Sequence, residues 1–165
     1  MMRILTYFRQ KPTRSAVPLA GIALLLLALP FTASAELGGD ATSVLADQAH
    51  MKATLKTTQT GTYTVHEIQA PSGTVVREYV SPVGKVFAVA WRGPFLPDLH
   101  QVLGASFTPF TQAAQAQKRQ RTGRGPVVVQ QDGLVVKSAG HARNYFGKAY
   151  LPELLPQGVS AEDIR

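Results

Sequence analysis

The stretch GTVVREYVSPVGKVFAVAWRGP, from Gly73 to Pro94, decides the fold class of this chain. It contains two runs rich in β-branched and aromatic residues, joined by the turn Pro82-Val83-Gly84. Proline presets φ for the first central position of a turn, and glycine accepts the positive φ that closes a hairpin loop. The stretch therefore predicts a β-hairpin.

The second run, from Val86 to Trp91, is apolar at every position, which is typical of a strand covered on both faces. Alternation places the large Phe87, Val89 and Trp91 on one face and the small alanines between them on the other. We therefore expect this strand to be central in its sheet and to have something packed against each face.

Outward from this hairpin, β-type runs and turn residues predict an antiparallel meander, to which Pro71-Ser72-Gly73 adds a second Pro-x-Gly turn. A change of apolar face within the second run predicts a bulge near His66 and Glu67. The charged Arg77 and Glu78 are interpreted as salt-bridged sheet surface, with Glu67 or His66 opposite them. The expected strands are residues 51–58, 62–70, 74–81, 85–92, 127–131, 134–138 and 144–151, with Asp132-Gly133 as the turn of a later hairpin.

Helix signals complete the expected fold. Asp40 or Thr42 can cap a short N-terminal helix, and a helical insertion follows the fourth strand. Its first helix runs from Pro97-Asp98 to Gly104, its second opens at Thr108-Pro109 and runs toward Arg121, and Ser160 can cap a last turn. The prediction is an α+β fold, an antiparallel meander of about six or seven strands with a short N-terminal helix and a helical insertion between strands four and five.

The first 35 residues carry the three-part pattern of a secretory signal. Four basic residues come first, Ala16 to Leu29 is mostly apolar, and Ala33-Ser34-Ala35 is a small-x-small cleavage site. The apolar run is shorter than the about 20 residues of a membrane span. We expect cleavage after Ala35, export to the periplasm or the medium, and a single domain at residues 36–165 with a Pro-rich tail from about residue 152.

Export would also change the charge. The chain has 17 basic and 10 acidic residues, and four of the basic ones precede Ala35, so the remaining formal charge is only +3. This small excess does not support nucleic-acid binding. Absence of cysteine means that packing and hydrogen bonds stabilise the exported domain.

Catalytic signals are weak. The chain lacks a nucleophile elbow, a phosphate loop and a dinucleotide fingerprint, and its four histidines (His50, His66, His100 and His141) lack metal-ligand spacing. We expect no catalytic, cofactor-binding or metal-binding residues, although a hydrolase acting on envelope material through His66, Glu67 and His141 stays open. A carrier of a small apolar ligand, lined by aromatic residues, is a further alternative.

Interaction signals are stronger. The basic run from Lys118 to Arg124 follows a predicted helix and suggests at most weak contact with acidic lipid head groups. Prolines place two apolar pairs in loops, where they can dock on the sheet or meet a partner. Candidate partner-binding residues are Trp91, Phe95, Leu96, Arg119, Arg121, Arg124, Leu154 and Leu155.

Three segments carry a family resemblance: LGGDATSV, then HEIQAPSGTVVREYVSPVGKVFAVAWRGPFLPDLHQVLG, then GRGPVVVQQDGLVVKSAGHARNYFGKAYLPELLPQGVSAEDIR. Together they resemble the exported bacterial family called domain of unknown function twenty-eight forty-four, from Leu37 to Arg165. That family implies no activity and no site residues. Gly73 to Val89 alone is similar to PepSY-type periplasmic modules, which inhibit or chaperone a partner.

The leading functional expectation is a non-enzymatic exported interaction module, an accessory or inhibitor-like protein acting on another envelope or secreted protein. We expect no cofactor and no nucleic-acid partner. Membrane contact is expected only through an uncleaved signal or weakly through the basic run.

Overall fold

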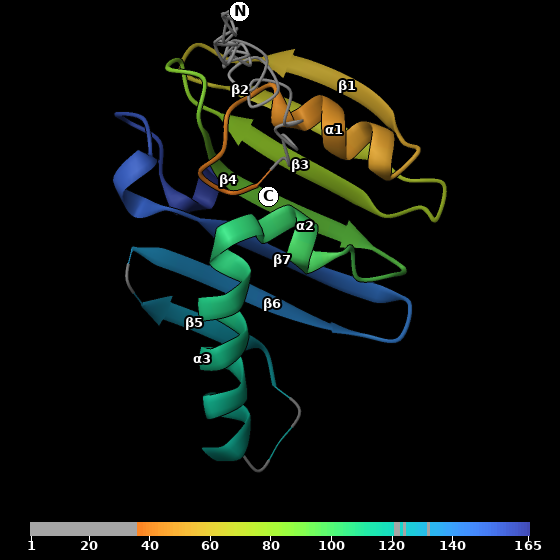
Figure 1. The fold of residues 1–165 in the computed structure, drawn as a ribbon, viewed down its shortest axis with the longest axis vertical. Helices are drawn as coiled ribbons and strands as arrows, with labels where there is room; N and C mark the ends of the chain where they lie inside the picture. Colours follow the sequence, from red (N-terminus) through yellow and green to blue (C-terminus); the bar gives the residue numbers. More distant parts are fainter. Residues whose placement is uncertain (1–35, 121–122, 124, 132) are drawn as a thin grey trace, which may run out of the picture. The chain divides into compact units, whose positions relative to one another are not determined.

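The computed structural model describes residues 36–120, 123, 125–131 and 133–165, so the predicted signal segment, residues 1–35, lies outside the described residues. The described part contains one seven-stranded antiparallel sheet (Figure 1). Its strands are β1 (Thr54–Gln59), β2 (Thr64–Gln69), β3 (Val75–Val80), β4 (Val86–Gly93), β5 (Val127–Gln131), β6 (Leu134–His141) and β7 (Asn144–Tyr150). The helices are α1 (Ser43–His50), α2 (Leu99–Leu103) and α3 (Phe107–Gln120), with 3₁₀ turns η3 (Gly104–Ser106), η4 (Pro152–Leu154) and η5 (Ala161–Asp163).

The predicted α+β fold is confirmed, including the short N-terminal helix and the helical insertion between strands four and five. The strand order is β1-β2-β3-β4-β7-β6-β5. Strand β4 therefore occupies the middle place, and every residue from Val86 to Trp91 is at most 2% exposed. None of the described helices combines the length and apolar character that crossing a bilayer requires.

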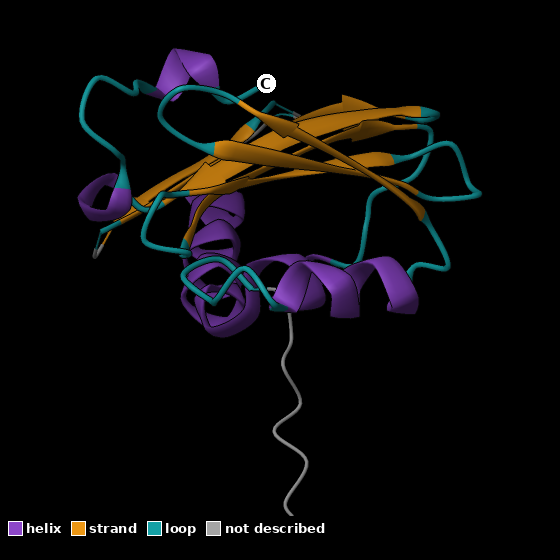
Figure 2. Cartoon of the chain, turned by 90° about the horizontal axis from the view of Figure 1, so that it is seen from above, coloured by secondary structure: helices purple, strands orange, loops and turns teal. Residues whose placement is uncertain are grey.

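Two different layers cover the sheet. Helices α1, α2 and α3 lie against one face, which we call the helix face, and the C-terminal segment of residues 155–165 lies on the other, which we call the tail face (Figure 2). On the helix face, Trp91 belongs to a core with Leu103 of α2 and Phe110 of α3. On the tail face, Ile164 belongs to a smaller core with Tyr79. This double cover explains why β4 is apolar throughout.

The sheet contains one bulge in β4, opposite the end of β3. Tyr79 pairs with Ala88, whereas the next residue, Val80, pairs with Val86. Phe87 is therefore the extra residue on its strand, and an extra residue reverses the order of faces on either side of it. The turn Pro82-Val83-Gly84 precedes the bulge, and Gly84 has the predicted positive φ of 78°.

The bulge corrects the predicted face of Phe87. Its ring lies on the tail face, 6.1 Å from the ring of Tyr79 and 5.9 Å from that of Tyr63 between centroids. Val89 and Trp91 belong to the core of the helix face. The prediction that the three large side chains share a face was therefore wrong for Phe87. Alternation of faces assumes a strand without a bulge, whereas β4 contains an extra residue at this position.

The bulge predicted near His66 and Glu67 was wrong. Register is unbroken along β2, with His66 opposite Thr57 and Glu78, and Glu67 opposite Arg77. Apolar residues occur on both faces of β2 because both faces of the sheet have packed cores: Val65 packs on the tail face and Ile68 in the core of the helix face.

The predicted helix start at Asp98 and the predicted cap at Ser160 are both present. Asp98 caps α2 by accepting a hydrogen bond from the His100 N–H at 2.9 Å, and Ser160 accepts one from the Glu162 N–H. The predicted side-chain cap of α1 was wrong. Thr42 makes no such bond. The carboxylate of Asp40 instead pairs with Lys85, at 2.8 Å.

Candidate binding groove

The tail face carries two rows of side chains that cross the middle of the sheet. Directly paired residues of antiparallel neighbours project from the same face. Arg92 of β4 pairs with Phe146 of β7, and Phe146 pairs with Ala139 of β6. We call Arg92, Phe146 and Ala139 the Phe146 row.

The second row lies two residues further along the same strands. Ala90 pairs with Lys148, Lys148 with Lys137, and Lys137 with Val128 of β5. We call these four residues the Lys137 row. Because a strand rises about 3.3 Å per residue, the two rows lie roughly 7 Å apart.

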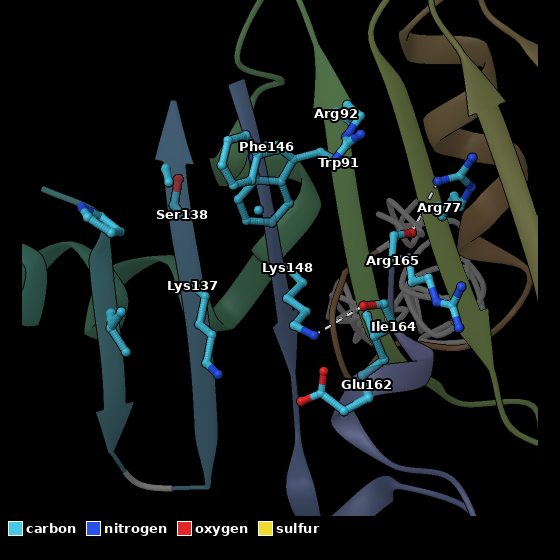
Figure 3. Close-up of a pocket in the computed structure, with 14 residues that line it drawn as sticks. Arg77, Trp91, Arg92, Lys137, Ser138, Phe146, Lys148, Glu162, Ile164 and Arg165 are labelled. Atoms are coloured by element: carbon cyan, nitrogen blue, oxygen red, sulfur yellow. Dashed lines mark hydrogen bonds between the residues drawn. The ribbon is translucent and has the colours of Figure 1, made fainter. Parts of the chain in front are cut away.

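An open groove of about 1040 Å³ follows the two rows (Figure 3). Main chain of β6 and β7 forms its floor between the rows, since Ser138 and Gly147 alternate with the row residues. The groove is lined by Arg77, Trp91, Arg92, Pro126, Val128, Lys137, Ser138, Ala139, Phe146, Gly147, Lys148, Glu162, Ile164 and Arg165.

The C-terminal segment forms one wall of the groove and is held there by cations of the sheet. Lys148 Nζ donates hydrogen bonds to the main-chain oxygens of Ala161 at 2.5 Å and Ile164 at 3.2 Å. Arg77 Nη1 donates to the Arg165 oxygen at 3.1 Å. Figure 3 shows the contacts of Lys148 with Ile164 and of Arg77 with Arg165 at the boundary between sheet and segment. Two of the groove's cations thus position its wall.

The groove is strongly positive. Among the described residues, five cations line it, Arg77, Arg92, Lys137, Lys148 and Arg165, against one side-chain carboxylate, Glu162. Arg77 also pairs with Glu67, with 2.7 Å between Nε and Oε2. Within the described residues, Arg92, Lys137 and Arg165 have no carboxylate at ion-pair distance. Their charges are available to an anionic partner.

Apolar surface accompanies this charge. Phe146 is 40% exposed and Val128 is 42% exposed, although both lie within strands. The Arg92 guanidinium carbon lies 5.9 Å from the centroid of the Phe146 ring, close enough for a cation–π contact. Exposed apolar groups between cations suit a ligand that combines negative charge with an apolar side chain.

A buried acid pair lies on the opposite, helix face, away from the groove. Glu78 and Asp47 are each 1% exposed. Burial, followed by hydrogen bonding to Asp47 and its negative charge, raises the pKa of Glu78 to about 9. Glu78 is therefore protonated at neutral pH and donates to Asp47, which also accepts from Gln101 Nε2 at 2.5 Å. The interpretation of Glu78 as sheet surface was wrong, whereas the pairing of Glu67 with Arg77 is confirmed.

The residues of the hydrolase alternative do not come together. His66 and Glu67 are consecutive in β2 and project from opposite faces, and burial lowers the pKa of His66. His141 lies on β6, four strand positions from β2, or roughly 19 Å. Among the described residues, no three His, Cys, Asp or Glu side chains form a group that could hold a metal ion.

The predicted partner-binding residues lie at several separate places. The side chain of Trp91 is buried, and among the predicted residues that the structure describes it alone lines the groove. Phe95 and Leu96 are 58% and 46% exposed in the loop after β4, where Thr74 Oγ1 donates to the Phe95 oxygen at 2.8 Å.

The remaining predicted residues that the structure describes also lie away from the groove. Leu154 is exposed in η4, whereas Leu155 packs against the core of the tail face. Arg119 is exposed near the end of α3. Arg121 and Arg124 lie outside the described residues. The described members of the predicted set therefore do not form one surface.

Comparison with known proteins gives one family. The family described as Protein of unknown function (DUF2844) matches residues 33–164. The chain belongs to this family. No curated protein and no solved structure matches it significantly. The likeness of Gly73 to Val89 to PepSY-type modules is not supported by any match.

Sequence reasoning missed the groove residues Arg92, Lys137, Phe146 and Lys148. A local signal existed for two of them, since the expected strands 134–138 and 144–151 alternate and can form a hairpin with Lys137 and Lys148 on one face. Arg92 could not be found in this way, because fifty residues of chain separate β4 from β7. DUF2844 membership added no residue roles.

Proposed function

We propose that this DUF2844 protein is a non-enzymatic interaction module that binds an acidic segment of another exported protein in the tail-face groove. The observation that carries the proposal is the lining of the groove, five cations and one carboxylate around the exposed Phe146 ring. Complementary charge orients a partner and speeds its association, while apolar contact contributes affinity.

A polypeptide fits this lining better than other anions. Phe146 and Val128 expose apolar surface that an acidic polysaccharide would not fill, since such a polymer carries no apolar side chains. A flat anionic bilayer would meet the wall made by Glu162 and Arg165 before it met the floor. An acidic segment with apolar side chains can use both features of the groove.

Export forms part of the proposal. Residues 1–35 have the basic start, apolar run and small-x-small site of a secretory signal, and the family match begins at residue 33, within the small-x-small site. We propose cleavage after Ala35. Mass measurement of the protein recovered from a bacterial periplasm or medium tests this, and retention of residues 1–35 in the exported protein would contradict it.

Charge reversal tests the binding site. The probe is a fluorescein-labelled peptide of several glutamates with one phenylalanine, and Kd is measured by fluorescence anisotropy. Lys137→Glu and Arg92→Glu should each weaken binding by about tenfold or more, since each replaces an attraction by a repulsion. Lys118→Glu, an exposed cation near the end of α3, is the control with the same change of charge.

Three outcomes would overturn the proposal. The first is no binding of the peptide to the unmodified protein. The second is equal weakening by Lys118→Glu, which would indicate unspecific attraction. The third is binding to phosphatidylglycerol vesicles or polygalacturonate that is tighter than binding to the peptide and unaffected by Lys137→Glu.

A further inference from the structure

The two rows of the groove differ in chemistry. On β7, Phe146 and Lys148 are separated by one residue, and on β6 the corresponding pair is Ala139 and Lys137. Each strand thus presents an apolar group and then a cation roughly 7 Å further along. A ligand that uses both rows needs an apolar group and an anion at the same separation.

Lys137 is the cation of its row that is available to that anion. Lys148 lies directly opposite, but its ammonium group already donates to two main-chain oxygens of the C-terminal segment. Within the described residues, Lys137 makes no ion pair or side-chain hydrogen bond. In the other row, Phe146 provides the large exposed apolar group.

We propose that the partner segment binds in an extended conformation and carries an apolar residue and an acidic residue two positions apart. The apolar side chain contacts Phe146, and the carboxylate pairs with Lys137. This inference rests on the proposed function and adds the sequence pattern of the partner. The pattern is apolar-x-acidic for one direction of the bound segment along β7 and acidic-x-apolar for the opposite direction.

The extended conformation follows from the match of spacings. Side chains at alternate positions of an extended chain project from one face and are separated by the same roughly 7 Å as the two rows. In a helix, side chains two positions apart do not share a face, and those that do are three or four positions apart. An apolar residue and an acidic residue two positions apart therefore use both rows only in an extended segment. An extended segment along β6 and β7 can set both side chains onto the floor.

Isomeric peptides test the spacing. Gly-Ser-Phe-Ser-Glu-Ser-Gly and Gly-Ser-Glu-Ser-Phe-Ser-Gly place the two side chains two positions apart, whereas Gly-Ser-Ser-Phe-Glu-Ser-Gly has the same composition with the pair adjacent. Peptides this short do not form stable helices in water. At least one spaced peptide should bind about tenfold more tightly than the adjacent one, because adjacent side chains of an extended chain project to opposite faces.

Protein variants connect the effect to the two residues. Lys137→Met keeps the aliphatic stem and removes the charge, and Phe146→Ala removes the exposed ring. Either change should abolish the preference for the spaced peptides over the adjacent one. Lys118→Met should leave it unchanged. Each variant is compared with the unmodified protein by thermal unfolding, so that loss of fold is separated from loss of binding.

The results distinguish this inference from the proposed function. Equal affinity of the spaced and adjacent peptides, with both weakened by Lys137→Glu, would overturn the spacing rule and leave the acidic partner in place. Absence of binding by all three peptides, while the glutamate-rich peptide still binds, would overturn only the spacing rule. Absence of binding by all four peptides, or binding that no groove variant changes, would overturn both.

Discussion

Lys137 and Lys148 lie directly opposite each other on β6 and β7, and both line the groove on the tail face. Like charges in directly opposite positions destabilise a sheet. The C-terminal segment accepts hydrogen bonds from Lys148, whereas no carboxylate of the described chain lies within ion-pair distance of Lys137. Lys137 therefore lowers the stability of the fold, which is consistent with a role of this residue in binding.

Replacing Lys137 should therefore stabilise the protein. Lys137→Thr removes the repulsion and introduces a residue with higher strand propensity, so the free energy of unfolding should rise by about 0.5 kcal/mol. Urea denaturation measures it. Lys56→Thr on β1 is the matched control, because Lys56 lies opposite Glu67 and its loss removes an attraction. A lower stability of Lys137→Thr than of Lys56→Thr would contradict this reasoning.

Stability should fall as pH rises because of Glu78. Its pKa is about 9 in the folded protein and near 4.5 in the unfolded chain, so between these values the unfolded state loses a proton that the folded state retains. The free energy of unfolding should therefore decrease by up to about 1.4 kcal/mol per pH unit from this group, and level off above pH 9.

Glu78→Gln should remove that dependence while it keeps a donor toward Asp47. Unfolding curves are measured at pH 5, 6.5 and 8. The free energy of unfolding of the variant, relative to that of the unmodified protein, should be highest at pH 8. Glu162→Gln, at an exposed position, controls for the loss of one carboxylate. Parallel pH profiles of Glu78→Gln and the unmodified protein would show that Glu78 is ionised in the fold.

Gly147 permits the close approach of Trp91 to β7. A Cβ at this position would lie 2.4 Å from Trp91 Cζ2 and 2.6 Å from the Lys137 oxygen. Gly147→Ala should lower the free energy of unfolding by about 1–3 kcal/mol, since the overlap displaces a buried indole. Gly61→Ala is the control, because its Cβ would meet nothing within 4 Å. Similar melting temperatures for the two variants would refute the tight contact.

Tyr79 fixes the end of the C-terminal segment. Its Oη donates to the Arg165 oxygen and accepts from the Arg165 N–H, each at 2.9 Å. Tyr79→Phe should cost about 1 kcal/mol and speed hydrogen exchange of the Arg165 amide without affecting β4 amides. Tyr63→Phe keeps the same ring and serves as control. Unchanged exchange at Arg165 would mean that the other contacts suffice to hold the segment.

Local patterns predicted the fold well. The continuous apolar run of β4, the positive-φ glycines and the helix start at Asp98 each act over a few residues, and each was confirmed. The bulge at Phe87 was not predicted, because it depends on register with β3. Glu78 was misplaced for a related reason: a carboxyl on a strand looks exposed until Asp47 of a distant helix is packed over it.

The groove was not predicted, because it forms through long-range contacts that local sequence patterns do not reveal. Pairing of β4 with β7 brings Arg92 to Phe146 across more than fifty residues of chain, and Ile164 reaches the tail face from beyond the last strand. Charge counting gave only a small excess for residues 36–165. It could not show that five cations gather around one groove.

Mapping of amide chemical shifts during titration with the peptide Gly-Ser-Phe-Ser-Glu-Ser-Gly tests directly whether the tail-face groove is the binding surface. We expect the largest changes along Phe146 to Lys148, at Lys137 and at Arg165, with amides of α1 and β1 unaffected. Largest changes on α3 or around Phe95 and Leu96, or no change at saturating peptide, would contradict it.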